Sequence, residues 1–186
     1  MAAGVTTPVT RTARTSWVLL GKGIRVGTVI FTGHSELTID AKQRLAVPSK
    51  YRAQMEQSGE PGSLFCMPWD GHGLMLFPES VFRELADRQG KRMFPVGDGA
   101  ELQTDMFGLT ERLELDSAGR VTIPKFLTEL VGLKGDVVVI GARYRLDVKD
   151  RAAWMSGLKD RFQRYSRQGE TLDVGPMPTP PTRLAN

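Results

Sequence analysis

Two stretches of the chain show the same alternation of apolar and polar residues, roughly 75 positions apart. Residues 36–39 read Glu-Leu-Thr-Ile and residues 112–115 read Arg-Leu-Glu-Leu, as expected for half-buried strands, and each run leads into an aspartate. The segments that follow also repeat, since residues 40–48 and 116–124 both read D-x-x-x-R, then three residues, then proline. A repeat of this length is too long for a solenoid unit. It therefore predicts two fused copies of one small, β-rich module related by a pseudo-two-fold axis.

The same order of elements is predicted in both copies. Each D-x-x-x-R turn joins two strands, and the proline that follows suits the first turn of a short helix. Two further strands and a terminal helix complete each copy. These later elements are predicted at residues 64–67, 74–77, 79–89, 137–140, 146–148 and 151–165, with a helical piece at 100–107 in the connector.

The helices carry apolar residues at helical spacing. In the first short helix, Tyr51 and Met55 share one face, while Lys50 and Arg52 need not be buried. The second short helix is predicted to bury Phe126, Leu127, Leu130 and Val131. The last helix has a stripe that packs within the module or against a neighbouring subunit, formed by Trp154, Leu158, Phe162 and Tyr165.

The D-x-x-x-R pattern itself has two interpretations. In the first, the aspartate accepts backbone N–H groups of its turn and the arginine folds back onto the carboxylate, so that the turn is stapled. Glycine just before the arginine permits the positive φ of a tight turn, and Gln43 stands at this place in the first copy. The residues with this turn-orienting role are Asp40, Asp116 and Gly119. In the second interpretation, the turns project lysine and arginine toward a polyanion.

The net charge of +4 becomes informative when it is divided along the chain. Residues 1–28 contain four basic residues and no acid, and the rest balances 21 basic against 21 acidic residues. Within this balanced part, residues 41–54 hold four basic residues and residues 117–128 hold two, again without an acid. Acid-free basic stretches at the same place in both copies suit a surface that faces phosphates, because each contact releases counterions. An ordinary solvated face is the alternative.

Residue usage also excludes several classes of protein. The single cysteine, Cys66, rules out an intrachain disulfide, and its apolar neighbours indicate a small buried hydrophobe. His34 and His72 have no carboxylate or cysteine cluster at ligand spacing, so we expect no metal site. No run approaches the length of a membrane span. We expect an intracellular chain with no cofactor, no small-molecule substrate and no membrane contact.

The two ends differ from the repeated part in composition. Residues 1–28 are rich in threonine, alanine and glycine without a clear period, which predicts a flexible basic arm. Residues 167–186 carry four prolines and are predicted to be a disordered tail. The two modules are then residues 29–90 and 109–166, and residues 91–108 form a connector between them.

The paired D-x-x-x-R-x-x-x-P elements, each preceded by an alternating strand, resemble the MraZ family of bacterial proteins, whose halves belong to the AbrB-type swapped-hairpin superfamily. Residues 31–34 (Phe-Thr-Gly-His) resemble the usual start of the family, and residues 74–78 before a helix resemble the end of its first module. Gln43 departs from the usual Lys-Gly-Arg. The resemblance implies an α+β, mainly β fold, with two pseudo-symmetric AbrB-like modules forming a double-psi/swapped-hairpin β-barrel with flanking helices.

The resemblance also implies a function. It is that of a sequence-specific DNA-binding transcriptional regulator of the division and cell-wall gene cluster, cytoplasmic and nucleoid-associated, which acts as a ring-shaped homo-oligomer on repeated promoter boxes in double-stranded DNA. Arg44 and Arg120 are the expected central contacts, and Lys42 is an additional base or phosphate contact. The expected phosphate anchors are Lys50, Arg52 and Lys125.

Two other classes of protein are alternatives to this one. A ring-forming scaffold of the same fold would bind protein rather than DNA. An enzyme would use Asp40 and Asp116 as a carboxylate dyad that shares a proton, yet each aspartate has a basic residue nearby in sequence that holds it ionised. We therefore expect no enzymatic activity and no catalytic residues.

Overall fold

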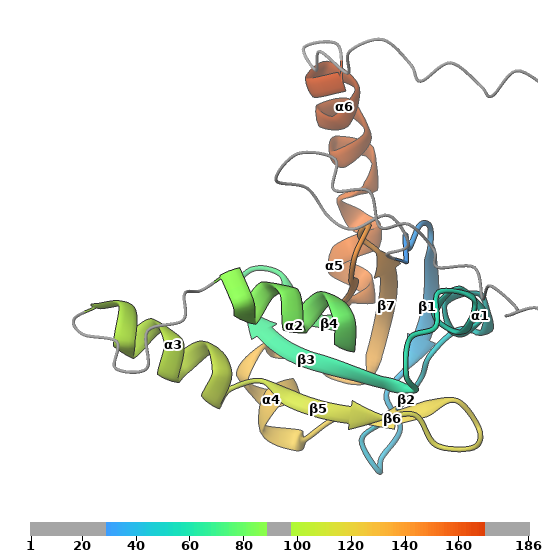
Figure 1. Ribbon diagram of the computed structural model, residues 1–186. Coiled ribbons are helices and arrows are strands. Elements are labelled where there is room, and N and C mark those ends of the chain that lie inside the picture. Colours follow the sequence, from blue (N-terminus) through green and yellow to red (C-terminus); the bar gives the residue numbers. More distant parts are fainter. Residues whose placement is uncertain (1–28, 89–97, 170–186) are drawn as a thin grey trace, which may run out of the picture.

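The computed structural model describes residues 29–88 and 98–169, whose strands form one six-stranded antiparallel sheet and a separate two-stranded ribbon (Figure 1). The strands are β1 (His34–Thr38), β2 (Arg44–Ala46), β3 (Ser63–Trp69), β4 (Gly73–Pro78), β5 (Glu111–Glu114), β6 (Arg120–Thr122), β7 (Asp136–Gly141) and β8 (Leu146–Asp150). The helices are α1 (Ser49–Gln57), α2 (Glu79–Arg88), α3 (Asp98–Gly108), α4 (Lys125–Leu130), α5 (Arg151–Ser156) and α6 (Leu158–Gly169). The predicted arm, the connector up to residue 97 and the tail from residue 170 lie outside the described residues.

The order of strands in the large sheet is β1-β7-β8-β4-β3-β5. Exchanging the halves of the chain, so that β1 replaces β5, β3 replaces β7 and β4 replaces β8, returns the same order read backwards. The first strand of each half therefore pairs with the third strand of the other half, β1 with β7 and β5 with β3. The ribbon follows a related rule, because β2, the second strand of the first half, pairs with β6, the second strand of the other. The two halves interlock through these pairings.

Every ladder in the described residues is antiparallel, and six helices flank the strands, which confirms the predicted α+β class. Within residues 29–88 and 98–169 the ladder does not close into a barrel. β1 and β5 stand at the two edges of the sheet, and the ribbon is not hydrogen-bonded to it as part of one ladder.

The main core lies between the large sheet, the ribbon and the two short helices. Phe31 and Tyr51 are fully buried and meet edge to face, with ring centroids 5.5 Å apart. The Tyr51 hydroxyl donates to the carbonyl of Gly33 at 2.8 Å, so its polar atom is satisfied. Fully buried residues from both halves complete this core: Leu45, Leu64, Leu74, Leu76, Val121, Ile123, Leu127, Val137 and Leu146.

A second, smaller apolar cluster lies under α2. Phe82 of this helix stacks on Phe65 of β3, with ring centroids 4.3 Å apart. Cys66, the next residue of β3, is buried as predicted, and burial raises the pKa of its thiol to about 12. In Figure 1, α3 and α6 extend away from the sheet in different directions. None of the helices in the described ranges is long and apolar enough to cross a membrane.

The structure corrects two details of the predicted helices. On α4, Leu127 is buried, but Phe126 and Leu130 are 44% and 59% exposed. Two of the four residues predicted for the buried face of this helix are therefore exposed. The single helix predicted at 151–165 is divided into α5 and α6, because Gly157 ends the first of them. The Trp154, Leu158, Phe162 and Tyr165 stripe is thus split between two helices.

Candidate nucleic-acid interface

The turn between β1 and β2 is stapled by its aspartate. Asp40 Oδ1 accepts the backbone N–H groups of Lys42 at 2.8 Å and Arg44 at 2.9 Å. Asp40 Oδ2 accepts from Arg44 Nε at 2.7 Å and lies 2.6 Å from a terminal guanidinium nitrogen. One carboxylate thus fixes both the backbone of the turn and the direction of the arginine.

The turn between β5 and β6 has the same geometry. Asp116 Oδ1 accepts the backbone N–H groups of Ala118 and Arg120, each at 2.9 Å. Asp116 Oδ2 accepts from Arg120 Nε at 2.9 Å and lies 2.8 Å from a terminal guanidinium nitrogen. Gly119 has φ +73°, and Gln43 takes up the same left-handed conformation at φ 61°. The turn shape predicted from D-x-x-x-R is therefore present in both copies, although only one carries glycine.

The staple also sets the protonation state of the carboxylates. The guanidinium and backbone N–H of Arg44 lower the pKa of Asp40 to about 2. The backbone N–H and then the guanidinium of Arg120 lower the pKa of Asp116. Both groups are therefore ionised at neutral pH, whereas a catalytic dyad needs one carboxyl that keeps its proton.

The ribbon places both arginines on one outward face. In its register Arg44 is opposite Thr122 and Ala46 is opposite Arg120, so Arg44 and Arg120 occupy diagonal positions on the same side. The other side carries Leu45 and Val121, which are fully buried. The arginine side chains are 31% and 37% exposed. Each guanidinium has five N–H donors and the aspartate engages two of its nitrogens, so donors are left for a ligand.

Figure 1 shows the two turns as protruding loops, light blue beside β2 and yellow beside β6. Small cavities adjoin both turns, of about 350 Å³ beside the first and about 470 Å³ beside the second. Lys125 and Lys134 line the first cavity together with Asp40 and Gln43. Arg52 lines the second one.

The remaining predicted anchors differ in their surroundings. Lys42 is exposed on the first turn. Lys125 forms an ion pair with Glu129 at 3.1 Å. Lys50 donates from Nζ to the carbonyl of His34 at 2.9 Å, and it lines neither turn cavity. The structure therefore brings Lys125 to the first turn and Arg52 to the second, and it places Lys50 apart from both.

Sequence reasoning missed Lys134 as a neighbour of the first turn. This lysine lies after α4, beyond the acid-free stretch at 117–128 that directed attention to the second copy. It reaches the first turn because β7, which follows it, pairs with β1. The proximity of Lys134 to the first turn thus follows from a long-range strand pairing and not from the local sequence.

Comparison with known proteins identifies the chain. A "Transcriptional regulator MraZ" from Methylococcus capsulatus is 31% identical over 147 residues, which cover 79% of this chain and 95% of that protein. The chain belongs to the MraZ family. A second MraZ regulator, from Chromobacterium violaceum, is 33% identical over 130 residues, covering 69% of this chain and 86% of the relative. A third, from Saccharopolyspora erythraea, is 28% identical over 146 residues, which cover 78% of this chain and 99% of that protein.

The family model described as "MraZ protein, putative antitoxin-like" matches residues 106–171. This range contains the second D-x-x-x-R turn, α4 and the following hairpin. The MraZ regulators align over most of the chain, so the similarity extends to the first turn's half as well. The resemblance inferred from the two D-x-x-x-R elements is thus confirmed.

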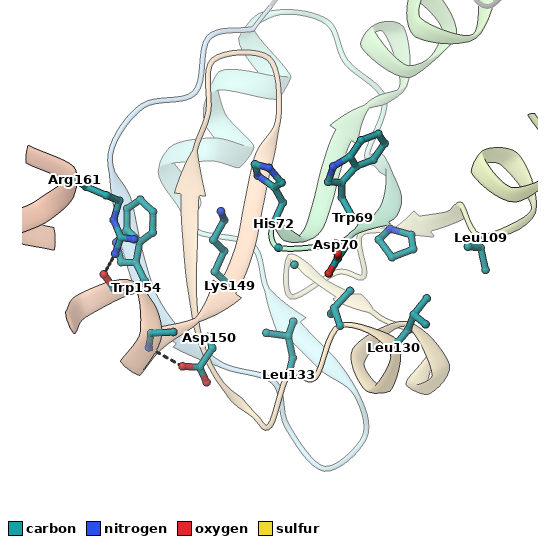
Figure 2. Close-up of a pocket in the computed structure, with 15 residues that line it drawn as sticks. Trp69, Asp70, His72, Leu109, Leu130, Leu133, Lys149, Asp150, Trp154 and Arg161 are labelled. Carbon is teal, nitrogen blue, oxygen red and sulfur yellow. Dashed lines mark hydrogen bonds between the residues drawn. The ribbon is translucent and has the colours of Figure 1, made fainter. Parts of the chain in front are cut away.

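A cavity larger than the two beside the turns lies elsewhere in this MraZ family member. It measures about 650 Å³ and contains no residue of either D-x-x-x-R turn. Figure 2 shows Trp69, the last residue of β3, and His72 of the β3–β4 connection on one side and Trp154 with Arg161 on the other, with Lys149 between them. The Arg161 guanidinium lies over the Trp154 ring, 4.0 Å from its centroid, and donates to the Trp154 carbonyl. The cavity and the turns are separate features.

The stapled aspartates predict a dependence of stability on pH. A carboxyl whose pKa is lower in the folded than in the unfolded state stabilises the fold above its ordinary pKa, and this stabilisation is lost as the pH falls. For Asp40 the loss extends from the ordinary 3.8 down to about 2. We expect the thermal midpoint to fall on acidification through this window, and Asp40→Asn to flatten the fall because the group no longer titrates. Thermal unfolding at a series of pH values would measure the change in the midpoint. An equally steep fall in Asp40→Asn would contradict the assignment of this loss of stability to Asp40.

Proposed function

We propose that this chain is a sequence-specific DNA-binding transcriptional regulator that presents Arg44 and Arg120 to duplex DNA from the outward face of the β2–β6 ribbon. The observation that carries the proposal is this face, on which two arginines, each oriented by its own aspartate, occupy diagonal positions. The name "transcriptional regulator" of the relatives supports it.

The geometry suits recognition of the major groove. A two-stranded β-ribbon fits this groove, and an arginine that keeps two parallel donors can contact the O6 and N7 atoms of guanine. The staple holds the guanidinium in one orientation before binding, which reduces the entropy lost on contact. Lys42, Arg52 and Lys125 flank the turns and would contact phosphates, which position the protein without reading sequence. Lys50 belongs to this group only if it exchanges its bond to His34 for a phosphate.

The fold in this proposal is a pair of AbrB-like modules at residues 29–90 and 109–166, with the connector at 91–108. The palindromic strand order and the pairing of β1 with β7 and β5 with β3 support two swapped, pseudo-symmetric modules around a barrel-like core. The equivalence of the two stapled turns supports the same division.

The regulator would act as a ring-shaped homo-oligomer on repeated promoter boxes of the division and cell-wall gene cluster, in the cytoplasm and at the nucleoid. Phe162 and Tyr165 on α6 are 68% and 72% exposed, and such apolar side chains favour contacts between copies. Assembly would let weak single subunits bind together, because the second contact forms at high effective concentration once the first is made.

The experiment measures binding of the purified chain to the DNA upstream of its own gene across a salt series. We expect Arg44→Ala and Arg120→Ala each to weaken specific binding by about 5- to 150-fold, since a bidentate arginine–base contact is worth about 1–3 kcal/mol of discrimination. Arg88→Ala is a matched control, because Arg88 also pairs with a carboxylate four residues away, Glu84 at 2.6 Å, but lies on α2.

The control should bind as the parent chain does. Circular dichroism and sedimentation would establish that each variant keeps its fold and assembly. Binding that neither ribbon substitution weakens, or that ignores salt, would overturn the proposal. A ring-forming protein-interaction scaffold of the same fold, with the stapled turns in a structural role, would then be the better account.

A further inference from the structure

The two repeats differ where the short helix of each meets the turn of the other. A shift of 76 positions along the sequence makes Gln43 equivalent to Gly119 and Arg52 equivalent to Thr128. At one corner the Thr128 hydroxyl of α4 lies 3.1 Å from Gln43 Oε1. At the other corner the Arg52 guanidinium of α1 covers Gly119, and a Cβ at this glycine would lie only 2.5–2.8 Å from its atoms. The first turn therefore pairs a large turn residue, Gln43, with a small helix residue, Thr128. The second turn pairs a small turn residue, Gly119, with a large helix residue, Arg52.

The backbone enforces these crossed contacts. The Gln43 carbonyl accepts the N–H of Ile123 at 2.8 Å, and the Gly119 carbonyl accepts the N–H of Val47 at 3.0 Å. Each bond ties the turn of one repeat to the segment that leads into the helix of the other. Arg52 therefore belongs to the first repeat in sequence and to the second turn in space.

The exchange also moves a charge. The first turn has Lys42, whereas the equivalent position of the second turn is Ala118. Arg52 brings a guanidinium to this second turn, and among the described residues only its Nε is engaged, donating to the Val47 carbonyl at 3.0 Å. Glu56, Glu60 and Asp116 line the same cavity, but no ion pair with Arg52 forms among the described residues. Its terminal N–H groups are therefore left for an external acceptor.

We infer that Arg52 is the second cation of the 116–120 turn and binds a phosphate group beside Arg120, replacing the lysine that this turn lacks. The inference rests on the proposed DNA binding. With it, each turn has one aspartate-bound arginine and one further cation, Lys42 from the first turn itself and Arg52 from a helix across the interface between repeats. The two turns then present different phosphate donors, so the chain contacts the DNA backbone asymmetrically despite the pseudo-two-fold fold.

The test relocates the charge. Binding to the upstream DNA is measured against salt concentration for Arg52→Gln and for Arg52→Gln combined with Ala118→Lys. We expect Arg52→Gln to reduce the magnitude of the slope of log affinity against log salt by about 0.9 for each bound subunit, the value for one lost phosphate contact on duplex DNA. The lysine introduced by Ala118→Lys stands where the first turn has its own lysine, so the double variant should recover the slope of the parent chain.

A matched control places the same lysine on the exposed neighbouring position of α1, as Arg52→Gln with Ala53→Lys. This variant has the same net charge and should not restore the slope. Arg52→Lys keeps the charge and should keep the slope, which provides a second readout if Arg52→Gln fails to fold. An unchanged slope in folded Arg52→Gln, or equal rescue by Ala53→Lys, would overturn the inference. Failure of the parent chain to bind this DNA would instead overturn the proposed function.

Discussion

Leu127→Ala is expected to lower the free energy of unfolding by about 2–5 kcal/mol, the range for truncating a buried leucine. Leu127 is fully buried in the main core, where it meets residues of both halves. Leu130→Ala, three residues further along the same helix, should change the free energy of unfolding by less than about 0.5 kcal/mol. Leu130 is 59% exposed, so little apolar contact is lost when it is shortened.

Comparing Leu127→Ala with Leu130→Ala separates the effect of burial on stability from the effect of helix propensity. Both variants make the same chemical change on α4, and alanine favours the helix equally in each. Urea unfolding followed by circular dichroism and by tryptophan fluorescence would give both free energies and test whether the transition is two-state. Equal losses in the two variants would mean that Leu130 is buried as well, against the exposure that the structure gives it.

The error in the predicted face of α4 shows what a single periodic pattern can decide. Four apolar residues at helical spacing indicated one buried face, but only the side of Leu127 and Val131 turns inward. The repeat contained the missing signal. Positions 126 and 130 are equivalent to Lys50 and Gln54 of α1, which are poor candidates for a core, whereas 127 is equivalent to the fully buried Tyr51. Superimposing the two copies would have placed Phe126 and Leu130 outside.

The stapled turns could be predicted because their interactions are local. The aspartate meets partners two and four residues later, so the pattern D-x-x-x-R already contains every group involved. The same reasoning anticipated the left-handed conformation of Gly119, and the structure shows that Gln43 adopts it as well. Sequence distance and spatial distance agree in these turns.

The composition of each corner could not be predicted in this way. Arg52 lies beside Gly119, and Thr128 beside Gln43, only because β2 pairs with β6 and the halves interlock. An acid-free stretch of sequence assigned Arg52 to the first turn's surroundings. The structure assigns it to the second. Pairings between strands far apart in the chain decide which charges share a surface, and no local pattern records them.

Gly73→Ala is expected to destabilise the fold by about 3 kcal/mol or more, because backbone strain and a steric clash add together. Gly73 has φ +81°, and a Cβ at this position would lie 2.3 Å from the carbonyl oxygen of Val148. This oxygen belongs to the backbone of β8, so a side-chain rotation cannot relieve the contact. β4 and β8 would have to move apart.

Gly71→Ala in the same connection is the matched control. Gly71 also has a positive φ, +69°, but no atom lies within 4 Å of the place that a Cβ on this residue would occupy. The free energy of unfolding of Gly71→Ala should therefore fall only by the cost of a left-handed alanine, about 1–2 kcal/mol. Thermal unfolding of the two variants would separate strain from clash, and similar losses in both would mean that β8 yields easily.

The larger loss at Gly73 follows from the position of its neighbour in the sheet. β4 and β8 are the two middle strands, and they join through only three residue pairs, Leu74 with Val148, Met75 with Asp147 and Leu76 with Leu146. On either side lies a three-stranded group that already contains strands of both repeats. A displaced β8 would therefore separate two groups that each hold part of both halves. Hydrogen exchange in Gly73→Ala should rise first at the amides of this central junction, and protection retained there would show that the loss arises elsewhere.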